Sequence, residues 1–505
     1  MVFNPPALEY SALAPMLVVL TGAVIAVIIE GFLPARHRSS IQLSVSLGTV
    51  ILALAQVIRL RGTATASAAL TSVVIDGPVL FIQGTILILS LFSLLLISDR
   101  DHFVAQASSI PGSAEERGAL QVGKTQTEIY PLTLFAVAGM MLFPAANDLI
   151  TLFVALEVMS LPLYLMAGLS RRRRLLSQEA ALKYFLLGAY SSAFFLFGSA
   201  FLYGFAGTLS LDGIKSAISG GPGNDLFLLI GLVSISVGLL FKVGAVPFHA
   251  WTPDVYQGAP TPITGFMAAA TKVAAFGATL RIFYVSFAGA VWSWRPIITA
   301  IAVITMLVGS LLAIAQRDVK RMLAYSSIAH AGFLLTGVLA LNAQGLRASL
   351  FYLAIYGLAT IGAFAIVTLV RDSSGEVTDL NRWVGLAKRS PFVASTFALF
   401  LLSFAGIPLT SGFIGKFTIF SAAYESGNIG VVVVGVLSSA IAAFFYIRVI
   451  VMMFFTDPTE DSVAVTIPSI YTSATIAITA LFTILLGVFP TPLLDAIASL
   501  ATFLR

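Results

Sequence analysis

The sequence contains no cysteine and little charge. Its 505 residues include only 4 histidines, and Asp, Glu, Lys and Arg together make up 10% of the chain. Without cysteine, the chain cannot hold a thiolate-ligated iron–sulfur cluster, a covalent c-type haem, a zinc ribbon or a disulfide. Soluble proteins have about 25% charged residues, and a chain with so few cannot cover a surface exposed to water. The scarcity of charge therefore excludes a soluble protein.

Long apolar runs take the place of charge. Hydrophobic residues make up 58% of the chain, and the mean hydropathy is +0.98. A helix needs about 20 mostly apolar residues to cross a bilayer core, and segments of that length predict an all-α polytopic membrane protein with about 14 transmembrane helices. The predicted spans are 13–33, 41–58, 77–97, 129–144, 148–169, 179–206, 226–250, 262–287, 296–315, 322–341, 347–370, 392–422, 429–455 and 470–489.

Basic residues concentrate in alternate loops. Four consecutive arginines, Arg171–Arg174, occupy one such loop, and others lie in the Ser98–Glu128 loop, the longest polar insert. Loops rich in Lys and Arg stay on the cytoplasmic side. The net charge of +5 therefore reports orientation and not nucleic-acid binding. We predict a multi-pass protein of a plasma membrane with both termini on the outer side.

Half of the eight lysines lie inside predicted spans. They are Lys183, Lys242, Lys272 and Lys416. A charge at the bilayer centre costs at least about 2.5–3.5 kcal/mol, so these lysines are expected to line an interior. Lysine changes protonation readily when buried, whereas arginine does not. Glu157 is the acidic counterpart, expected to pair with Lys242, and the alternative is an ion pair that only pins two helices. Arg281 and Arg448, near span ends, are interpreted as interfacial.

Two spans contain a helix break. Pro247 follows Gly244 in the seventh span, and Pro408 follows Gly406 in the twelfth. Interrupted helices in corresponding halves indicate the inverted repeats of transporters, and breaks five spans apart place two inverted five-helix repeats at spans 4–8 and 9–13. The predicted segments are 1–128 (three helices and a cytoplasmic loop), 129–287 and 288–455 (the repeats) and 456–505 (a C-terminal helix).

Two motifs resemble a known family. FKVGAVPFHAWTPDVYQGAPTP (Phe241–Pro262), with ATK at 270–272, is similar to a signature of the antiporter-like subunits of respiratory complex I, and KRMLAYSSIAH (Lys320–His330) is similar to a second. The similarity extends from span 4 to span 13. It is greatest to the N-type subunit, because L-type chains have further C-terminal spans and a lateral helix. L and M types usually have histidine at Lys272, and M types glutamate at Lys416.

The resemblance implies roles in proton transfer for matching residues. The implied set is Glu157 as acidic partner, Lys242 as pumping lysine, Lys272 as relay, Lys416 as exit and Lys183 as a further charged group. His249 and His330 have the chemistry to bridge gaps between lysines, although a packing role is an equal alternative.

The resemblance also implies what the chain does and with what. It implies a membrane-arm subunit that translocates protons, driven by electron transfer from NADH to quinone in partner subunits. FMN, iron–sulfur clusters and quinone would belong to those partners, with no cofactor or metal in this chain. The expected partners are other membrane-arm subunits, including the other antiporter-like subunits and the lateral helix of the L-type subunit. Alternatives are a subunit of a multisubunit cation/proton antiporter and a non-transporting scaffold; spans 7 and 12 lack the polar clusters of a substrate permease.

Overall fold

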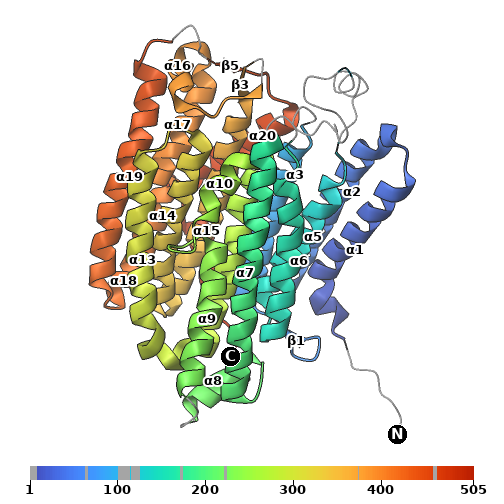
Figure 1. The fold of residues 1–505 in the computed structure, drawn as a ribbon, viewed down its shortest axis with the longest axis vertical. Helices are drawn as coiled ribbons and strands as arrows, with labels where there is room; N and C mark the ends of the chain where they lie inside the picture. The colour runs from blue at the N-terminus through green and yellow to red at the C-terminus, as the bar shows by residue number, and fades with distance from the viewer. Residues whose placement is uncertain are drawn as a thin grey trace.

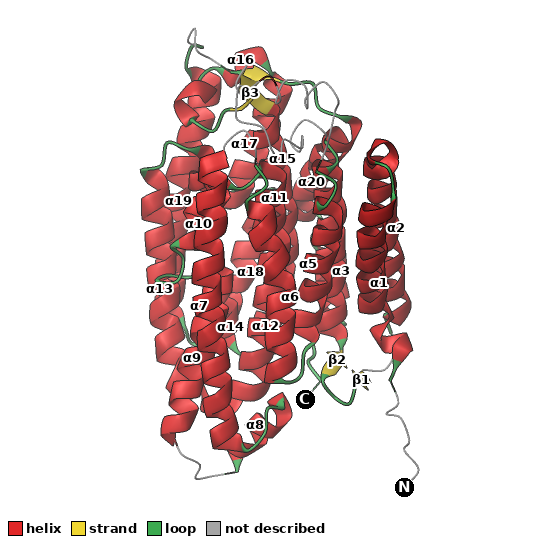
Figure 2. Ribbon diagram, turned by 45° about the vertical axis from the view of Figure 1, so that its right-hand side comes forward, coloured by secondary structure: helices red, strands yellow, loops and turns green. Residues whose placement is uncertain are grey.

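The structure of the protein is a computed structural model. It covers residues 8–62, 66–99, 114, 126–170, 174–220, 225–372, 375–458 and 463–504. Most of these residues form helices that run roughly parallel to one another (Figures 1 and 2). Most of the Ser98–Glu128 loop, and Arg171–Arg173 of the basic run, lie outside the described residues.

Three long helices precede the repeats. They are α1 (Tyr10–Phe32), α2 (Ala35–Leu60) and α3 (Gly77–Ile97), and a hairpin of β1 (Ala66–Ala68) and β2 (Val73–Ile75) joins the last two. Helix α3 begins where the Asp76 side chain accepts a hydrogen bond from the Val79 amide at 3.1 Å, which satisfies one of the free N–H groups at its N-terminus. In Figure 2, α1 and α2 stand at the edge of the bundle.

The first predicted repeat forms five crossings. Its elements are α5 (Ile129–Leu142), η2 (Phe143–Ala145), α6 (Leu149–Ala167), α7 (Arg174–Ala206), α8 (Leu211–Ser219), α9 (Asp225–Val243), α10 (Trp251–Gly258), α11 (Thr261–Phe266), η3 (Met267–Thr271), α12 (Lys272–Arg281), η4 (Ile282–Ser286) and η5 (Phe287–Ala290). The eighth span differs from the plain helix expected, because η3 and η4 are π-helical turns on either side of α12. Such turns are frequent at functional sites.

The second predicted repeat is followed by two C-terminal helices. The elements are α13 (Val291–Ile314), α14 (Val319–Ala340), α15 (Ala343–Leu369), η6 (Leu380–Trp383), α16 (Leu386–Arg389), α17 (Pro391–Ala405), α18 (Ser411–Glu425), α19 (Ile429–Phe455), α20 (Ile470–Val488) and α21 (Thr491–Ala498). Strand β3 (Val370–Asp372) pairs with β4 (Gly375–Glu376) and β5 (Ala464–Val465). Figure 1 places this small sheet at the opposite end of the molecule from β1.

The helices account for the predicted crossings. Among the described residues, eleven helical runs are long and apolar enough to span a membrane, and the longest, Thr261–Ile314, holds two spans. Shorter apolar helices at Ile129–Ala145 and Pro391–Ala405 account for the rest. Helices α14 and α15 are buried almost throughout, whereas α1, α2, α7 and α19 expose rows of large apolar side chains. This pattern fits a bundle with a buried centre and an apolar outer face.

Both expected helix breaks are present. The seventh span is interrupted between α9 and α10, where Gly244 has a φ of +75°. The twelfth span is interrupted between α17 and α18, where Gly406 has a φ of +82°. Glycine adopts this left-handed conformation at little cost, and the following proline in each break cannot donate a helical hydrogen bond.

The two repeats share a turn that the sequence did not reveal. The Asp148 side chain caps α6, and the residues beside it exchange two backbone hydrogen bonds with the segment around Ser210. Asp318 caps α14, and its neighbours exchange the same two bonds with the segment around Asp379. Figure 1 places α8, which follows Ser210, and β3, close to Asp379 in the chain, at opposite ends. Matched turns at opposite ends support the inverted repeat.

Candidate functional site

Lys242 lies in the last turn of α9 in a cage of hydroxyls and rings. Its Nζ donates to Ser160 Oγ at 2.7 Å and to the Tyr164 hydroxyl at 3.1 Å. The ammonium also lies 5.3 Å from the centre of the Tyr164 ring and 5.7 Å from that of Tyr184. Ring faces attract cations. These hydroxyls and rings can stabilise a positive charge on a lysine that is only 3% exposed.

Glu157 does not form the direct ion pair with Lys242 that we expected. Its carboxylate accepts a hydrogen bond from the Ser192 hydroxyl on α7. Among the described residues the contacts of Lys242 are to Ser160 and Tyr164 instead. Ser160 lies one helical turn after Glu157 on α6, so the serine stands on the same helix face as the carboxylate. The Ser160 hydroxyl itself donates to the Leu156 carbonyl, so the acid and the lysine share a helix face without a hydrogen bond between them.

Lys272 begins α12, directly after a π-helical turn. Its Nζ donates to the backbone oxygen of Ser327 at 2.5 Å and to the Ser327 hydroxyl at 2.6 Å. The ring centre of Tyr356 lies 5.5 Å from the ammonium. Because Ser327 is on α14, this lysine of the first repeat is held by a residue of the second.

His330 lies one turn beyond Ser327 on the same face of α14. Its Nδ1 is 2.7 Å from the Tyr352 hydroxyl, and its Nε2 is 3.5 Å from the Tyr446 hydroxyl. His330, Tyr352, Tyr356, Ser403 and other residues line a cavity of about 10 Å³. A cavity of this size holds about one water molecule. The histidine thus has polar neighbours on three other helices of the second repeat, α15, α17 and α19.

Lys416 binds carbonyl groups that the helix break sets free. Its Nζ donates to the Phe404 oxygen at 2.7 Å, the Ala405 oxygen at 3.0 Å and the Ser439 hydroxyl at 2.8 Å. Pro408 lacks an N–H, so the carbonyl four residues earlier, that of Phe404, has no helical donor. The break therefore supplies two of the three partners of the lysine, and Ser439 of α19 is the third.

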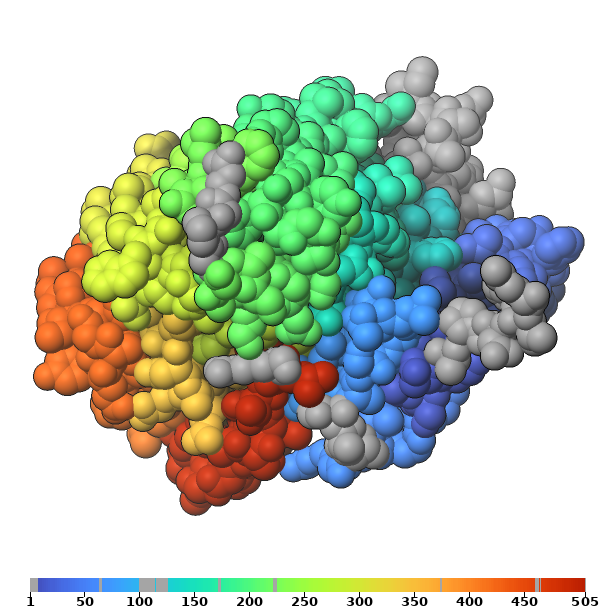
Figure 3. Space-filling model, turned by 90° about the horizontal axis from the view of Figure 1, so that it is seen from below, coloured from blue at the N-terminus to red at the C-terminus, as the bar shows by residue number. Residues whose placement is uncertain are grey.

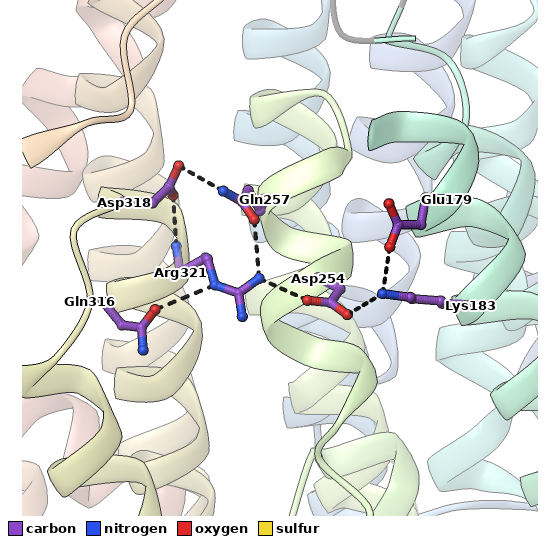
Figure 4. A network of polar contacts seen from close by, with 7 residues as sticks. All are labelled: Glu179, Lys183, Asp254, Gln257, Gln316, Asp318 and Arg321. Carbon is purple, nitrogen blue, oxygen red and sulfur yellow. Dashed lines mark hydrogen bonds and ion pairs between the residues drawn. The ribbon is translucent and has the colours of Figure 1, made fainter. Parts of the chain in front are cut away.

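The remaining predicted residues lie elsewhere. His249 sits half-buried in the first break, and its Nδ1 has no hydrogen-bond partner among the described residues. Lys183 is 41% exposed and pairs with Glu179 at 2.6 Å and Asp254 at 2.7 Å (Figure 4). Lys183 therefore stands apart from the buried lysines.

Arg281 does not extend to an exposed surface as a snorkelling side chain would. Its guanidinium is fully buried and forms a 2.7 Å ion pair with Asp76, which is also fully buried. Sequence position alone suggested a span end, but the partner comes from a segment far away in the chain. Arg448 differs, because it donates to the carbonyls of Ile314 and Gln316 at the end of α13.

Sequence reasoning missed a buried lysine and most of the hydroxyls. Lys320, counted as a loop residue, is 2% exposed and donates to the Ala259 oxygen at 2.6 Å. Glu157, Ser160 and Tyr164 follow at spacings of three and four residues, which places them on one face of α6. That polar stripe in an apolar helix was a readable signal.

The described residues show no group of three His, Asp or Glu side chains placed to hold a metal ion. They show instead buried lysines, hydroxyls and a histidine inside a bundle with two broken helices. Such a bundle defines the class of polytopic transporters built from inverted repeats.

Comparison with known proteins narrows this class. The family model of the NADH:quinone oxidoreductase/Mrp antiporter transmembrane domain matches residues 146–442. NADH-quinone oxidoreductase subunit N of Rhodococcus opacus is 56% identical, covering 99% of this chain and 97% of that protein. The Mycobacterium tuberculosis subunit N is 52% identical over 100% of both chains. The chain belongs to the subunit N family of NADH-quinone oxidoreductases.

Solved structures agree with the fold. A chain of respiratory complex I from Thermus thermophilus is 32% identical, with a TM-score of 0.80, and the match covers 96% of this chain and 99% of that one. A chain of the Mrp complex from Dietzia has a TM-score of 0.82 at 22% identity, covering 98% of this chain and 97% of that one. The second likeness is one of fold alone.

Proposed function

We propose that this chain is the membrane-arm subunit of an NADH-quinone oxidoreductase that translocates protons while partner subunits transfer electrons from NADH to quinone. The observation that carries the proposal is the connection from Lys272 through Ser327 and His330 toward Lys416. Lys272 binds Ser327 directly, and His330 lies one turn further on α14. The His330 and Lys416 surroundings share Phe404, whose ring faces the histidine and whose carbonyl binds the lysine.

Each buried lysine is suited to hold a proton and pass it on. An ammonium in a low-dielectric interior is stable only while hydrogen-bonded, so small changes among its partners shift the balance between the charged and neutral forms. In the proposed sequence Lys242 releases a proton toward Lys272. The neutral amine of Lys272 accepts it, and Lys416 receives it by way of Ser327 and His330. Arginine cannot take this part because it stays protonated.

An aromatic row lies between the first two lysines. Tyr184 stacks on Trp251 with ring centres 4.7 Å apart, and Trp251 meets Tyr256 edge-on at 6.4 Å. The hydroxyls of Tyr184 and Thr252 are buried without a partner among the described residues. Buried groups of that kind commonly bind water, which supports a hydrated step at this point.

Glu157 is proposed to adjust Lys242 electrostatically, from a position on the same face of α6 as Ser160, and not by contact. A carboxylate one turn away stabilises the ammonium electrostatically, and withdrawing its charge favours proton release. His249 is proposed as a helper in the first break. Lys183 is given no step in the transfer, because its ion pairs hold it outside the cage of Lys242.

Membership of the family supports a proposal for the partners and the placement of the chain. FMN, iron–sulfur clusters and quinone are proposed to reside in partner subunits. Direct neighbours are proposed to be other membrane-arm subunits, including antiporter-like subunits and the lateral helix of the L-type subunit. We place the chain in a bacterial plasma membrane with both termini outside. The charge bias of the loops supports this orientation. The start of α1 and the C-terminal residues lie at the same end of the bundle, which supports placing both termini on one side (Figure 1).

Lys242→Ala tests the proposal. In membrane vesicles containing the whole complex, we expect normal assembly and a loss of NADH-driven proton pumping of about tenfold or more, the scale of a lost acid–base group. Lys388→Ala is the matched control, because Lys388 pairs with Asp457 at the surface. Normal pumping by Lys242→Ala at normal turnover would favour the scaffold alternative. Cation exchange without NADH oxidation would favour an antiporter.

A further inference from the structure

A polar cluster joins the two repeats across the short helix α10. Figure 4 shows Asp254 of α10 between Lys183 of α7 and Arg321 of α14. One carboxylate oxygen, Oδ2, accepts from Lys183 Nζ at 2.7 Å, and the other, Oδ1, accepts from Arg321 Nη1 at 2.7 Å. Each oxygen of a single side chain is thus bound to a different repeat.

The second half of the cluster anchors α10 to the start of α14. Gln257, one turn after Asp254, accepts from Arg321 Nη1 at 3.1 Å and donates to Asp318 at 3.2 Å. Asp318 in turn caps α14 through the Arg321 amide at 3.0 Å and accepts from Thr378 at 2.6 Å. Because several directional hydrogen bonds join α10 to the start of α14, they fix how far α10 is shifted along α14 as well as its distance from α14.

The same helix packs against the Lys242 cage from outside. Trp251, one turn before Asp254, stacks on Tyr184, and its Nε1 donates to the Phe241 oxygen at 3.0 Å. Tyr184 follows Lys183 directly in α7, so α7 holds α10 at two points, by an ion pair and by a ring stack. A shift of α10 therefore moves the ring that packs against the cage.

We propose that Asp254 is a positioning residue that couples the two repeats. Its paired contacts to Lys183 and Arg321 hold α10, and with it the ring that packs against the Lys242 cage, in register with α14, which carries Ser327 and His330. Opening either contact lets α10 move relative to one repeat. The surroundings of Lys242 are then no longer aligned with Ser327 and His330 of the second repeat. Proton release from Lys242 is thereby uncoupled from the second repeat. This inference rests on the proposed function, since it assumes that Lys242 carries protons.

The proposal reassigns Lys183. Its resemblance-based role is proton transfer, yet its Nζ is shared between two carboxylates, those of Glu179 and Asp254, at the edge of the bundle. The partly exposed side chains, 41% for Lys183 and 28% for Arg321, fit a clamp and not a buried carrier.

The test uses membrane vesicles with the whole complex and measures protons pumped per electron, turnover and assembly. For Asp254→Asn we expect assembled complex with the proton-to-electron ratio lowered by about threefold or more, the scale of couplings carried by packed networks. Asp254→Glu should restore at least half of the loss, because it keeps the charge. Asp457→Asn, which removes the surface ion pair with Lys388, is the matched control and should leave the ratio unchanged.

A double-mutant cycle separates coupling from simple structural support. Lys183→Met and Arg321→Met should each lower the ratio, and the double variant should lower it no further than the stronger single variant, because releasing either side already frees α10. Additive losses would overturn the proposal, since independent contacts add. If Asp254→Asn fails to assemble, the proton-to-electron ratio of Lys183→Met decides the question. The Lys183 side chain is partly exposed, so its replacement should not prevent folding.

The outcomes also distinguish this inference from the proposed function. A normal ratio in Asp254→Asn together with a lost ratio in Lys242→Ala would overturn the coupling role and leave the proposed function standing. A normal ratio in both variants would overturn the proposed function as well.

Discussion

Three buried lysines, Lys242, Lys272 and Lys416, each meet the cost of a charge with a different set of partners. Lys242 has two hydroxyls and aromatic faces, Lys272 has both oxygens of Ser327, and Lys416 has carbonyls and one serine. Hydrogen bonds to a charged group stabilise it by about 1.5–3 kcal/mol each. None of these partners is an acid in direct contact, so the ammonium is held without being locked in a salt bridge. This is a suitable state for a group that must release its proton.

Lys416→Arg separates charge from proton transfer at the residue scale. An arginine keeps the positive charge and can donate to the same carbonyls, but it cannot give up its proton. We expect assembled complex with pumping reduced by about tenfold or more, measured as NADH-driven acidification of inverted vesicles. Pumping near the wild-type rate would mean that this position acts only through its charge.

At the scale of elements, the two broken helices use their breaks differently. In the twelfth span the carbonyls released by Pro408 bind Lys416 directly. In the seventh span, Lys242 points away from the break and contacts α6. The backbone carbonyl of Phe241, near the break, accepts a hydrogen bond from the Trp251 indole. The same device therefore serves a lysine in one repeat and positions an aromatic ring in the other.

Gly406→Ala tests whether the second break shapes the lysine site. Gly406 has a φ of +82°, and a Cβ there would lie 2.9 Å from Lys416 Cδ. We expect a loss of stability of about 1–2 kcal/mol from backbone strain and, in addition, a clear loss of pumping because the lysine is displaced. Thermal unfolding of the purified complex and the vesicle assay measure the two effects.

Gly427→Ala is the matched control for that variant. Gly427 has a φ of +81°, but a Cβ there would meet nothing within 4 Å. It should show the strain without the loss of pumping. Equal pumping losses in both variants would show that backbone strain, and not contact with Lys416, is the cause.

At the scale of the whole molecule, a buried ion pair joins the start of α3 to the first repeat and contacts the C-terminal residues. Arg281 pairs with Asp76, which also accepts from the Leu504 amide at 3.0 Å, and the Phe503 ring lies 4.8 Å from the guanidinium. Figure 3 shows the C-terminal segment beside the segment that contains α3 on the lower face. The N-terminal helices, the first repeat and the C-terminal residues therefore meet at one point.

Arg281→Met should destabilise the protein strongly. It leaves Asp76 buried without a counter-charge, which typically costs about 3–5 kcal/mol. We expect little assembled complex on blue-native gels. Arg281→Met with Asp76→Asn should recover assembly, because asparagine still caps α3 and no charge remains unpaired. Arg295→Met is the control. Arg295 donates to the Leu339 carbonyl, so its removal leaves no carboxylate unpaired, and assembly should be retained. A double variant no better than Arg281→Met would contradict the ion-pair explanation.

The sequence by itself determined the membrane class, the crossings, the two breaks and three of the buried lysines, Lys242, Lys272 and Lys416. These features are local. A hydrophobic run forms a span, a proline interrupts it, and a charge among apolar residues requires partners, wherever the helix lies in the bundle. The motifs around Lys242 and His330 further pointed to the family.

Only the tertiary structure decided which side chains meet. It separated Glu157 from Lys242, moved Lys183 into the cluster around Asp254, and paired Arg281 with Asp76. Helices that are apolar on nearly every face carry no periodic pattern that fixes how each one is rotated toward its neighbours. That rotation is set by packing between segments distant in the chain, and the polar contacts of the site follow from it.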